Sequence, residues 1–253
     1  MSGLLAQIWR HPIKAHGREE ITHVKLSEGR SLPWDRRWAV AHEMAKLDFD
    51  RPGWAPCANF SRGSKAPALQ AITARCDMSF QTVTLSHPKL KDLTISPDAD
   101  GAGGELVQWI MPLVPKDRAL PSRIARAPGR GMTDTDYPSI SLINLSSHRV
   151  VEGQLGRRIS PLRWRANLIV DGLGPWEELE WVGKRIRVGA ADLEVVEPIT
   201  RCLATAASTR SGQRDTDTLG ALNEGWGHQL MGVYARVATT GDIRQGDPVG
   251  PVP

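Results

Sequence analysis

One of the chain's three cysteines directly follows an arginine. In the stretch EVVEPITRCLATAAS, an alternating apolar segment leads into Arg201 and Cys202 and then into small residues. A neighbouring guanidinium lowers the pKa of a thiol and enriches the thiolate, which is the form that attacks electrophiles and binds metals. The alternative is a structural thiol inside the fold, since most free cysteines are of that kind.

A second group of polar residues begins the apolar segment RWRANLIVDG. If this segment is a strand throughout, Arg163, Arg165 and Asn167 share one of its faces because side chains alternate along a strand. Two guanidinium groups and an amide on one face can hold an anion through several hydrogen bonds. A solvated strand edge is the alternative interpretation of the same pattern.

Further cationic residues occur near the N-terminus. Lys14 follows an apolar segment and a proline in IWRHPIKA, and Asp35 and Arg36 precede another apolar segment in LPWDRRWAV. A lysine could hold a phosphate as a point charge and an arginine could hold it as a two-pronged donor. The alternative is surface charge with an Asp–Arg pair that contributes about 1 kcal/mol at most.

The remaining composition excludes several other classes of function. Three cysteines without a C-x-x-C pair argue against a disulfide framework and a zinc knuckle, and the seven histidines show no H-x-x-x-H spacing. The formal net charge of +4 is dispersed and no nucleic-acid motif occurs. No apolar run reaches the roughly 20 residues that span a bilayer. With no recognisable signal peptide, a cytoplasmic protein that binds neither membrane nor nucleic acid is expected.

The apolar pattern predicts the elements that must position these residues. Short alternating segments predict strands at 4–9, 21–26, 36–43, 68–73, 79–86, 139–145 and 165–172, two strands around Gly189, and closing strands after 230. Helices are expected near 148–155, with Ser146 or Ser147 as N-cap, and near 216–225. Many short strands with 24 glycines and 18 prolines predict a mainly β fold built on β-barrels with few short helices.

Two stretches are expected to lack regular structure. The segment SPDADGAGG is predicted to be a flexible loop, and the Pro- and Arg-rich segment around 120–135 to be a linker. This linker divides the chain into a domain at 1–120 and a domain at 121–253.

In combination, these segments resemble the MOSC-domain proteins, a family named for the C-terminal domain of molybdenum-cofactor sulfurase. IWRHPIKA and LPWDRRWAV are similar to two motifs of the β-barrel domain that precedes the MOSC domain in part of the family. RWRANLIVDG, PWEELEWVGKRIRVG, EPITRCLAT and GDIRQGDPV are similar to motifs of the MOSC domain itself. The order and spacing match over nearly the whole chain, in the layout of the mitochondrial amidoxime-reducing component.

The resemblance implies a molybdenum cofactor, a pterin with a dithiolene group and a phosphate. It implies that Cys202 ligates the metal or carries sulfur for the cofactor, and thiolate is a soft ligand suited to such a metal. It places Lys14 and Arg36 at the cofactor from the N-terminal domain. The residues it places there from the MOSC domain are Ser146, Ser147, Arg165, Asn167 and Arg201.

The chain departs from the family's motifs at three places. Ala15 replaces a serine that follows the lysine, and Arg-Ala-Asn replaces Arg-Pro-Asn at 165–167. The segment WAPCANFSRGSKAP stands roughly in the place of a Thr-Ala-Arg motif. It brings Cys57 and Arg62 to that place, where Cys57 is either a structural thiol or a second cysteine beside the cofactor.

Three functional hypotheses follow. The first is a molybdenum-dependent oxidoreductase that reduces N-hydroxylated or similar small substrates, with Cys202 as metal ligand and electrons from a separate donor protein. The second is a carrier of sulfur or cofactor that holds a persulfide on Cys202. The third is a non-catalytic anion-binding module. Pyridoxal phosphate binding is a further expectation at the level of the family.

Overall fold

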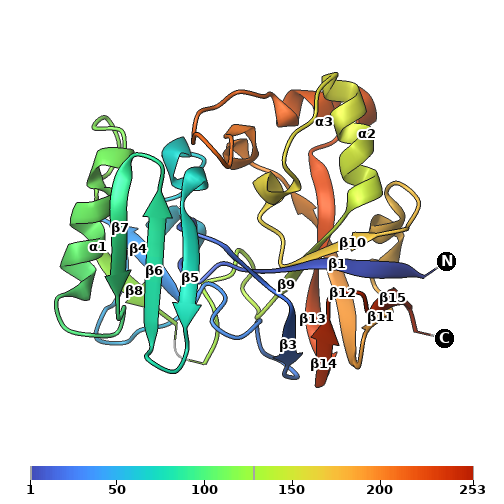
Figure 1. Cartoon of the computed structure of the whole chain (residues 1–253), viewed down its shortest axis with the longest axis horizontal. Helices are drawn as coiled ribbons and strands as arrows, with labels where there is room; N and C mark the ends of the chain where they lie inside the picture. The colour runs from blue at the N-terminus through green and yellow to red at the C-terminus, as the bar shows by residue number, and fades with distance from the viewer. Residues whose placement is uncertain (1, 128, 253) are drawn as a thin grey trace.

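The computed structural model describes residues 2–127 and 129–252. Strands predominate among them, with three α-helices and six short 3-10 helices, so the predicted mainly β class is confirmed (Figure 1). The longer helices are α1 (Ala102–Ile110), α2 (Leu145–Leu155) and α3 (Thr218–Trp226). No helix of the described residues is long and apolar enough to cross a bilayer.

Seven strands close into a barrel. Their order is β10-β9-β13-β12-β11-β15-β1, and a pairing between β1 and β10 closes the ring. The bounds are β1 (Gly3–Arg10), β9 (Ile140–Asn144), β10 (Leu168–Asp171), β11 (Arg185–Val188), β12 (Ala191–Thr200), β13 (Leu230–Thr239) and β15 (Pro248–Pro251). Only β9 and β10 run parallel among these pairs. Inward-facing residues such as Leu5, Leu142, Leu193 and Val233 are fully buried and form the barrel core.

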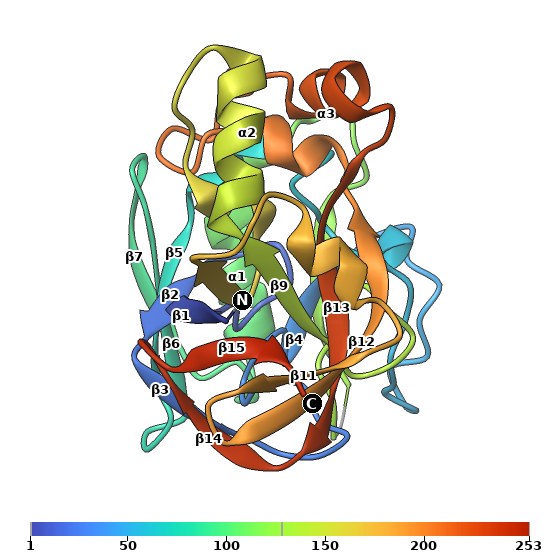
Figure 2. The ribbon, with the colours of Figure 1, turned by 90° about the vertical axis from the view of Figure 1, so that its right-hand side faces the viewer.

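The first strand belongs to this barrel although it lies far from the other six in sequence. β1 pairs with β10 and β15, and β2 (Glu19–Ile21) extends the sheet from its edge. β3 (His23–Leu26) pairs with β14 (Gly241–Arg244). Figures 1 and 2 show β1, in blue, beside strands from the second half. The division at 120/121 stays a prediction, and the strand pairing runs across it.

The rest of the first half forms smaller sheets at the left of Figure 1. β4 (Trp38–His42) pairs with β8 (Pro121–Arg126), and β5 (Thr73–Asp77), β6 (Thr82–His87) and β7 (Leu90–Ile95) form a three-stranded sheet. Helix α1 packs against β7 and β8. This part has its own apolar core, in which Leu85, Leu106 and Ile110 are fully buried.

Three predicted elements of the first half are wrong. Residues 67–71 form a 3-10 helix, η2 (Pro67–Ala71), because Pro67 at its first turn favours a helical start over a strand. The predicted loop 96–104 extends too far, since its last three residues begin α1. Burial of Ala102, Leu106 and Ile110 on one face of this helix outweighs the poor helix propensity of the glycines. The predicted linker contains β8, which pairs along the length of β4.

The second half follows its predictions more closely. The strands around Gly189, the closing strands and the helix capped by Asp217 are confirmed. Helix α2 is also confirmed, but its N-cap is Asn144, whose side chain accepts a hydrogen bond from the Ser146 N–H. The predicted cap at Ser146 or Ser147 is therefore wrong by two or three residues.

Candidate functional site

A cavity of about 490 Å³ opens between the barrel and the first half of the chain. Its volume lies in the range of small-molecule sites. Of the residues proposed from sequence to bind an anion, a metal or the cofactor, six line it: Lys14, Arg36, Arg163, Arg165, Arg201 and Cys202. They come from segments up to 188 positions apart, so only the folded chain brings them together.

The inner part of the cavity is cationic and built from turns. Lys14 and Arg36 are buried, with 5% and 9% of their surfaces exposed. The Lys14 N–H donates to the carbonyl of Trp38 at 2.7 Å, and the Arg36 N–H donates to the carbonyl of His11. These bonds interlock the loop after β1 with the loop before β4 and fix where both cations point.

The backbone at this end adopts an uncommon conformation. Arg36 and Arg165 have φ angles of 50° and 51°, and Ala15 has a φ of 64°. A positive φ is unfavourable for residues with a Cβ and tends to occur at functional sites. The hydrogen bond from Arg36 Nη2 to the Arg165 carbonyl, at 2.9 Å, links two of these residues and stabilises their conformation.

Arg165 does not lie on a strand face with Arg163, as the sequence predicts. Ser160 caps a 3-10 helix, η4 (Pro161–Trp164), and Arg165 is its left-handed C-cap. Arg163 consequently turns away from Arg165 and donates to Asp215 Oδ1 at 2.6 Å and to the Ala206 carbonyl at 3.0 Å. The predicted shared face is wrong because Pro161 begins a helical turn before the strand starts.

The Arg165 guanidinium lacks an anionic partner. It donates to Gln70 Oε1 at 3.5 Å and to the Gly17 carbonyl at 3.1 Å, and among the described residues no carboxylate lies within salt-bridge distance of it. Burial, followed by the nearby charges of Arg36 and Arg18, lowers the pKa of Arg165 to about 9. An anion bound beside this guanidinium would offset both the cost of burying its charge and the repulsion from the neighbouring arginines.

The lining of the whole cavity favours an anionic ligand. Six cationic side chains and three carboxylates line it. Two further carboxylates, Asp35 and Asp215, pair with Arg36 and Arg163 from outside the lining, which leaves an excess of one positive charge. One of the lining carboxylates is Asp134, whose side chain is 51% exposed and pairs with Lys14 Nζ. Its partial desolvation would raise the pKa of Asp134, but the charges of Lys14 and Arg36 together lower it to about 2. It is therefore ionised and compensates Arg165 only in part, because the pKa of Arg165 stays lowered although the charges of Asp35 and Asp134 act to raise it.

Cys202 lies at the outer end of the cavity. It follows β12 and forms the N-cap of the 3-10 helix η6 (Leu203–Ala206), and its side chain is exposed. Arg201 points inward, where Nε donates to the Met231 carbonyl and Nη1 to the Trp164 carbonyl at 2.8 and 2.7 Å. Arg201 therefore anchors the loop that carries Cys202, although it also lines the cavity.

Three of the residues proposed from sequence do not line the cavity. Ser147 is fully buried, and its hydroxyl donates to Glu178 Oε2 at 2.7 Å. Ser146 lies beside it in the first turn of α2. Asn167 is 1% exposed and helps to position Arg36. Its Oδ1 accepts hydrogen bonds from Arg36 Nη1 at 3.4 Å and from Ser141 Oγ at 2.9 Å.

The cavity also contains Tyr234, which the sequence did not indicate as a binding residue, and Cys57, for which the sequence left a place beside the cofactor open. Tyr234 faces it because strand alternation on β13 turns Val233 and Ala235 into the barrel and Tyr234 outward. Cys57 lines it too, and Arg62 Nη1 lies 3.5 Å from the Cys57 sulfur. The departure of this segment from the Thr-Ala-Arg motif was the signal that marked it in the sequence.

Protonation of His16 beside this site is expected to destabilise the fold. Its Nδ1–H donates to the Lys14 carbonyl at 2.7 Å, and its Nε2 is buried without a partner. Burial lowers the pKa of His16 to about 4 from the usual 6.5. The unfolded chain therefore binds the proton more readily, and stability is lost as the pH falls below about 6.5.

At pH 5 this residue alone is expected to destabilise the protein by about 2 kcal/mol relative to pH 7, from about 1.4 kcal/mol per pH unit. Urea unfolding at both pH values should show that loss in the wild type. The variant His16→Gln has no proton to bind, so its loss should be smaller by that amount. Equal losses in the two proteins would contradict the buried neutral state of His16.

Two family models match the chain. Residues 132–250 match the MOSC domain, and residues 2–110 match the MOSC N-terminal beta barrel domain. The mouse mitochondrial amidoxime-reducing component 1 is 24% identical, over 98% of this chain and 82% of that protein. The molybdenum cofactor sulfurase of Drosophila grimshawi is 29% identical, over 85% of this chain but only 29% of its own length.

Solved structures also resemble the chain. The YUAD protein of Bacillus subtilis covers 98% of it with a TM-score of 0.48 and 13% identity. YiiM of Geobacillus stearothermophilus covers 45% with a TM-score of 0.35 and 22% identity.

Proposed function

Because the chain belongs to the MOSC-domain family and includes that family's N-terminal β-barrel domain, we propose that it is a molybdenum-cofactor-binding oxidoreductase. Its substrates are N-hydroxylated or similar small molecules. One observation supports this most strongly: the exposed thiol of Cys202 and the buried cations Lys14, Arg36 and Arg165 line a single cavity. The similarity to an amidoxime-reducing component over nearly the whole chain points to the same activity.

The donor set fits the proposed cofactor. Cysteine sulfur at the outer end is a soft ligand that suits molybdenum, and the guanidinium of Arg165, which has no carboxylate partner among the described residues, suits a phosphate together with Lys14 and Arg36. Asn167 holds Arg36 in place from behind. We therefore propose Cys202 as the metal ligand, and the three cations as the residues that hold the phosphate.

The cofactor, when bound, supplies the two-electron redox chemistry, and the chain's own residues bind and orient the substrate. Tyr234 is placed to help, because its hydroxyl lies 3.4 Å from Asp134 Oδ2. Burial, followed by the negative charge of Asp134, raises the pKa of Tyr234. Its hydroxyl therefore stays protonated, and the proton that it donates to Asp134 is the one that would have to turn toward a substrate oxygen.

The overall reaction requires a partner. Reduction of an N–OH group to N–H takes up two electrons and two protons and releases water. The chain's side chains do not store those electrons, so we propose that a separate donor protein delivers them. An artificial one-electron reductant can replace that partner in a test.

The proposal is tested with wild-type protein purified from a host that makes the cofactor. We expect close to one molybdenum per chain, and reduction of benzamidoxime to benzamidine with reduced methyl viologen as the electron source. Protein without molybdenum, even after incubation with free cofactor, would overturn the proposal. If such protein instead carried an extra sulfur on Cys202 by mass spectrometry, the sulfur-carrier hypothesis would replace it.

A further inference from the structure

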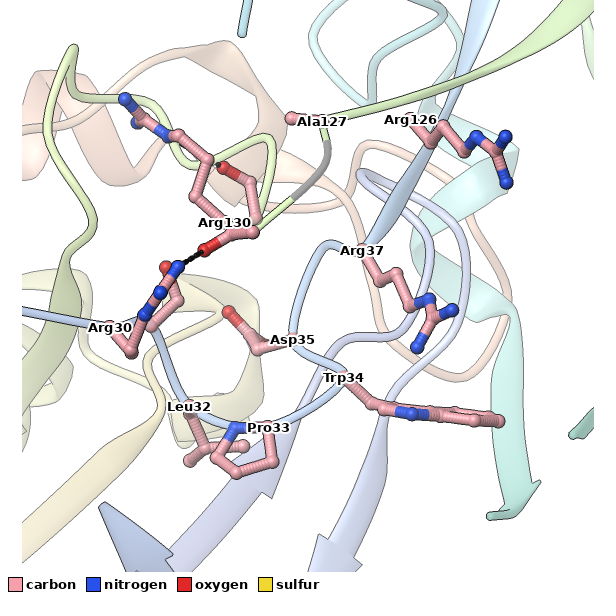
Figure 3. A pocket seen from close by; sticks show the side chains of 12 residues that line it. Arg30, Leu32, Pro33, Trp34, Asp35, Arg37, Arg126, Ala127 and Arg130 are labelled. Atoms are coloured by element: carbon pink, nitrogen blue, oxygen red, sulfur yellow. Dashed lines mark hydrogen bonds between the residues drawn. The ribbon is translucent and has the colours of Figure 1, made fainter. Parts of the chain in front are cut away.

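A second cavity of about 520 Å³ lies on the other side of the loop 30–37. It shares no lining residue with the cavity that contains Cys202. The adjacent residues Asp35 and Arg36 line different cavities, so the loop forms a wall between them. Figure 3 shows the second cavity, with Arg30 and Arg130 on one side and Arg37 and Arg126 on the other.

The four arginines around this cavity have too few carboxylates to balance them. Arg37 and Arg126 share one partner, Asp98, at 2.9 and 3.3 Å. Arg30 donates to the carbonyl of Gly129, a bond that Figure 3 marks. A neutral carbonyl leaves the charge of that guanidinium uncompensated.

Arg130 also lacks a carboxylate partner among the described residues. Its guanidinium donates to the carbonyls of Thr135 and Asp136, at 3.0 and 2.6 Å. The one carboxylate in the lining itself is Asp35, which already pairs with Arg36. Because the Arg130 guanidinium points to residues outside this cavity, the cavity has an excess of about two positive charges from Arg30, Arg37 and Arg126, counting Asp98 once.

Packing against two tryptophans holds Arg37 in place before any ligand arrives. The rings of Trp34 and Trp38 meet edge to face, with centroids 5.2 Å apart. The guanidinium carbon of Arg37 lies 5.4 and 5.0 Å from these two centroids, within cation–π distance. An arginine held in this way loses little freedom when it binds an anion.

We propose that this second cavity is a binding site for a small, multiply charged anion that carries phosphate groups or neighbouring carboxylates. The fork of a guanidinium matches the geometry of both groups. The cavity volume fits a compact ligand. The proposal is independent of molybdenum and of the function of Cys202, because no residue is shared between the two cavities.

Inorganic pyrophosphate and citrate are suitable probes, titrated into the full chain at constant chloride. Each is expected to shift the indole N–H signal of Trp34 in a saturable way, with the signal assigned from Trp34→Phe. Arg30 and Arg126 are the exposed arginines of this cavity, and both are replaced in the double variant Arg30→Gln/Arg126→Gln. This double variant is expected to bind each probe at least about tenfold more weakly than the wild type. Arg37→Gln is a second variant at the same cavity.

Arg62→Gln is the matched control, because it removes a cation from the first cavity only. It should leave the Trp34 titration unchanged. A phosphate-specific site would respond to pyrophosphate alone, and a general polyanion site to both probes, and either result supports the proposal. No saturable shift of Trp34 with either probe, or equal affinity in the wild type and both cavity variants, would overturn it.

Discussion

The variant Cys202→Ser is expected to reduce N-hydroxylated substrates at least about a thousandfold more slowly than the wild type. The hydroxyl of serine is a hard ligand that stays protonated at neutral pH, whereas the thiolate is a soft ligand. The side chain is exposed at the end of β12, so the change should leave the barrel intact. The rate is measured with reduced methyl viologen and benzamidoxime.

Cys76→Ser is the matched control for this experiment. Cys76 lies on β5, away from both cavities, and burial raises the pKa of its thiol. Its replacement should leave the turnover rate within about twofold of the wild type, since it contacts neither cavity. If Cys202→Ser kept full activity, Cys202 would be excluded as a ligand needed for turnover.

The variant Asp35→Ala is expected to cost about 3–5 kcal/mol of unfolding free energy. The carboxylate is fully buried, pairs with Arg36, and accepts the backbone N–H of His11 at 2.8 Å. Burial opposes its charge, but Arg36 and His11 together lower the pKa of Asp35. Without it, Arg36 would remain buried with an unpaired charge, and the wall between the two cavities would lose its central contact.

Urea unfolding measures this loss, with Asp192→Ala as the control. Asp192 pairs with Arg187 at 2.8 Å, but the Arg187 side chain is 56% exposed. Exposed pairs of this kind contribute about 1 kcal/mol or less. Similar losses in the two variants would show that Asp35 is not the internal anchor of Arg36.

Much of the fold could be predicted from the sequence, because alternation of apolar residues encodes a strand locally. β1, β4, β9 and the hairpin of β11 and β12 all appear where the pattern predicts them. The pairing of β1 with β10 and β15 could not be predicted, since it joins residues far apart in the chain. Helix α1 was missed because its stability comes from packing on β7 and β8 and not from its own glycine-rich sequence.

The site was only partly predictable for similar physical reasons. Lys14, Arg36, Arg165 and Cys202 were found from residue type and resemblance, and they line one cavity. The prediction that Arg163 and Arg165 share one face of a strand was wrong. Arg165 adopts a left-handed backbone conformation, which depends on contacts that a local sequence pattern does not encode. Ser146 and Ser147 came from the resemblance alone, and the structure places them at the start of α2, outside the cavity.

The central claim is that one cavity holds the metal at its thiol end and the phosphate at its cationic end. Molybdenum and pterin measured on the same preparations test it most directly. The wild type should contain both in equal amounts, and Cys202→Ser should keep the pterin but lose the molybdenum. Arg165→Gln should lose both about tenfold or more, because the phosphate loses a charge-assisted partner. Full molybdenum in Cys202→Ser, or full pterin in Arg165→Gln, would contradict the account.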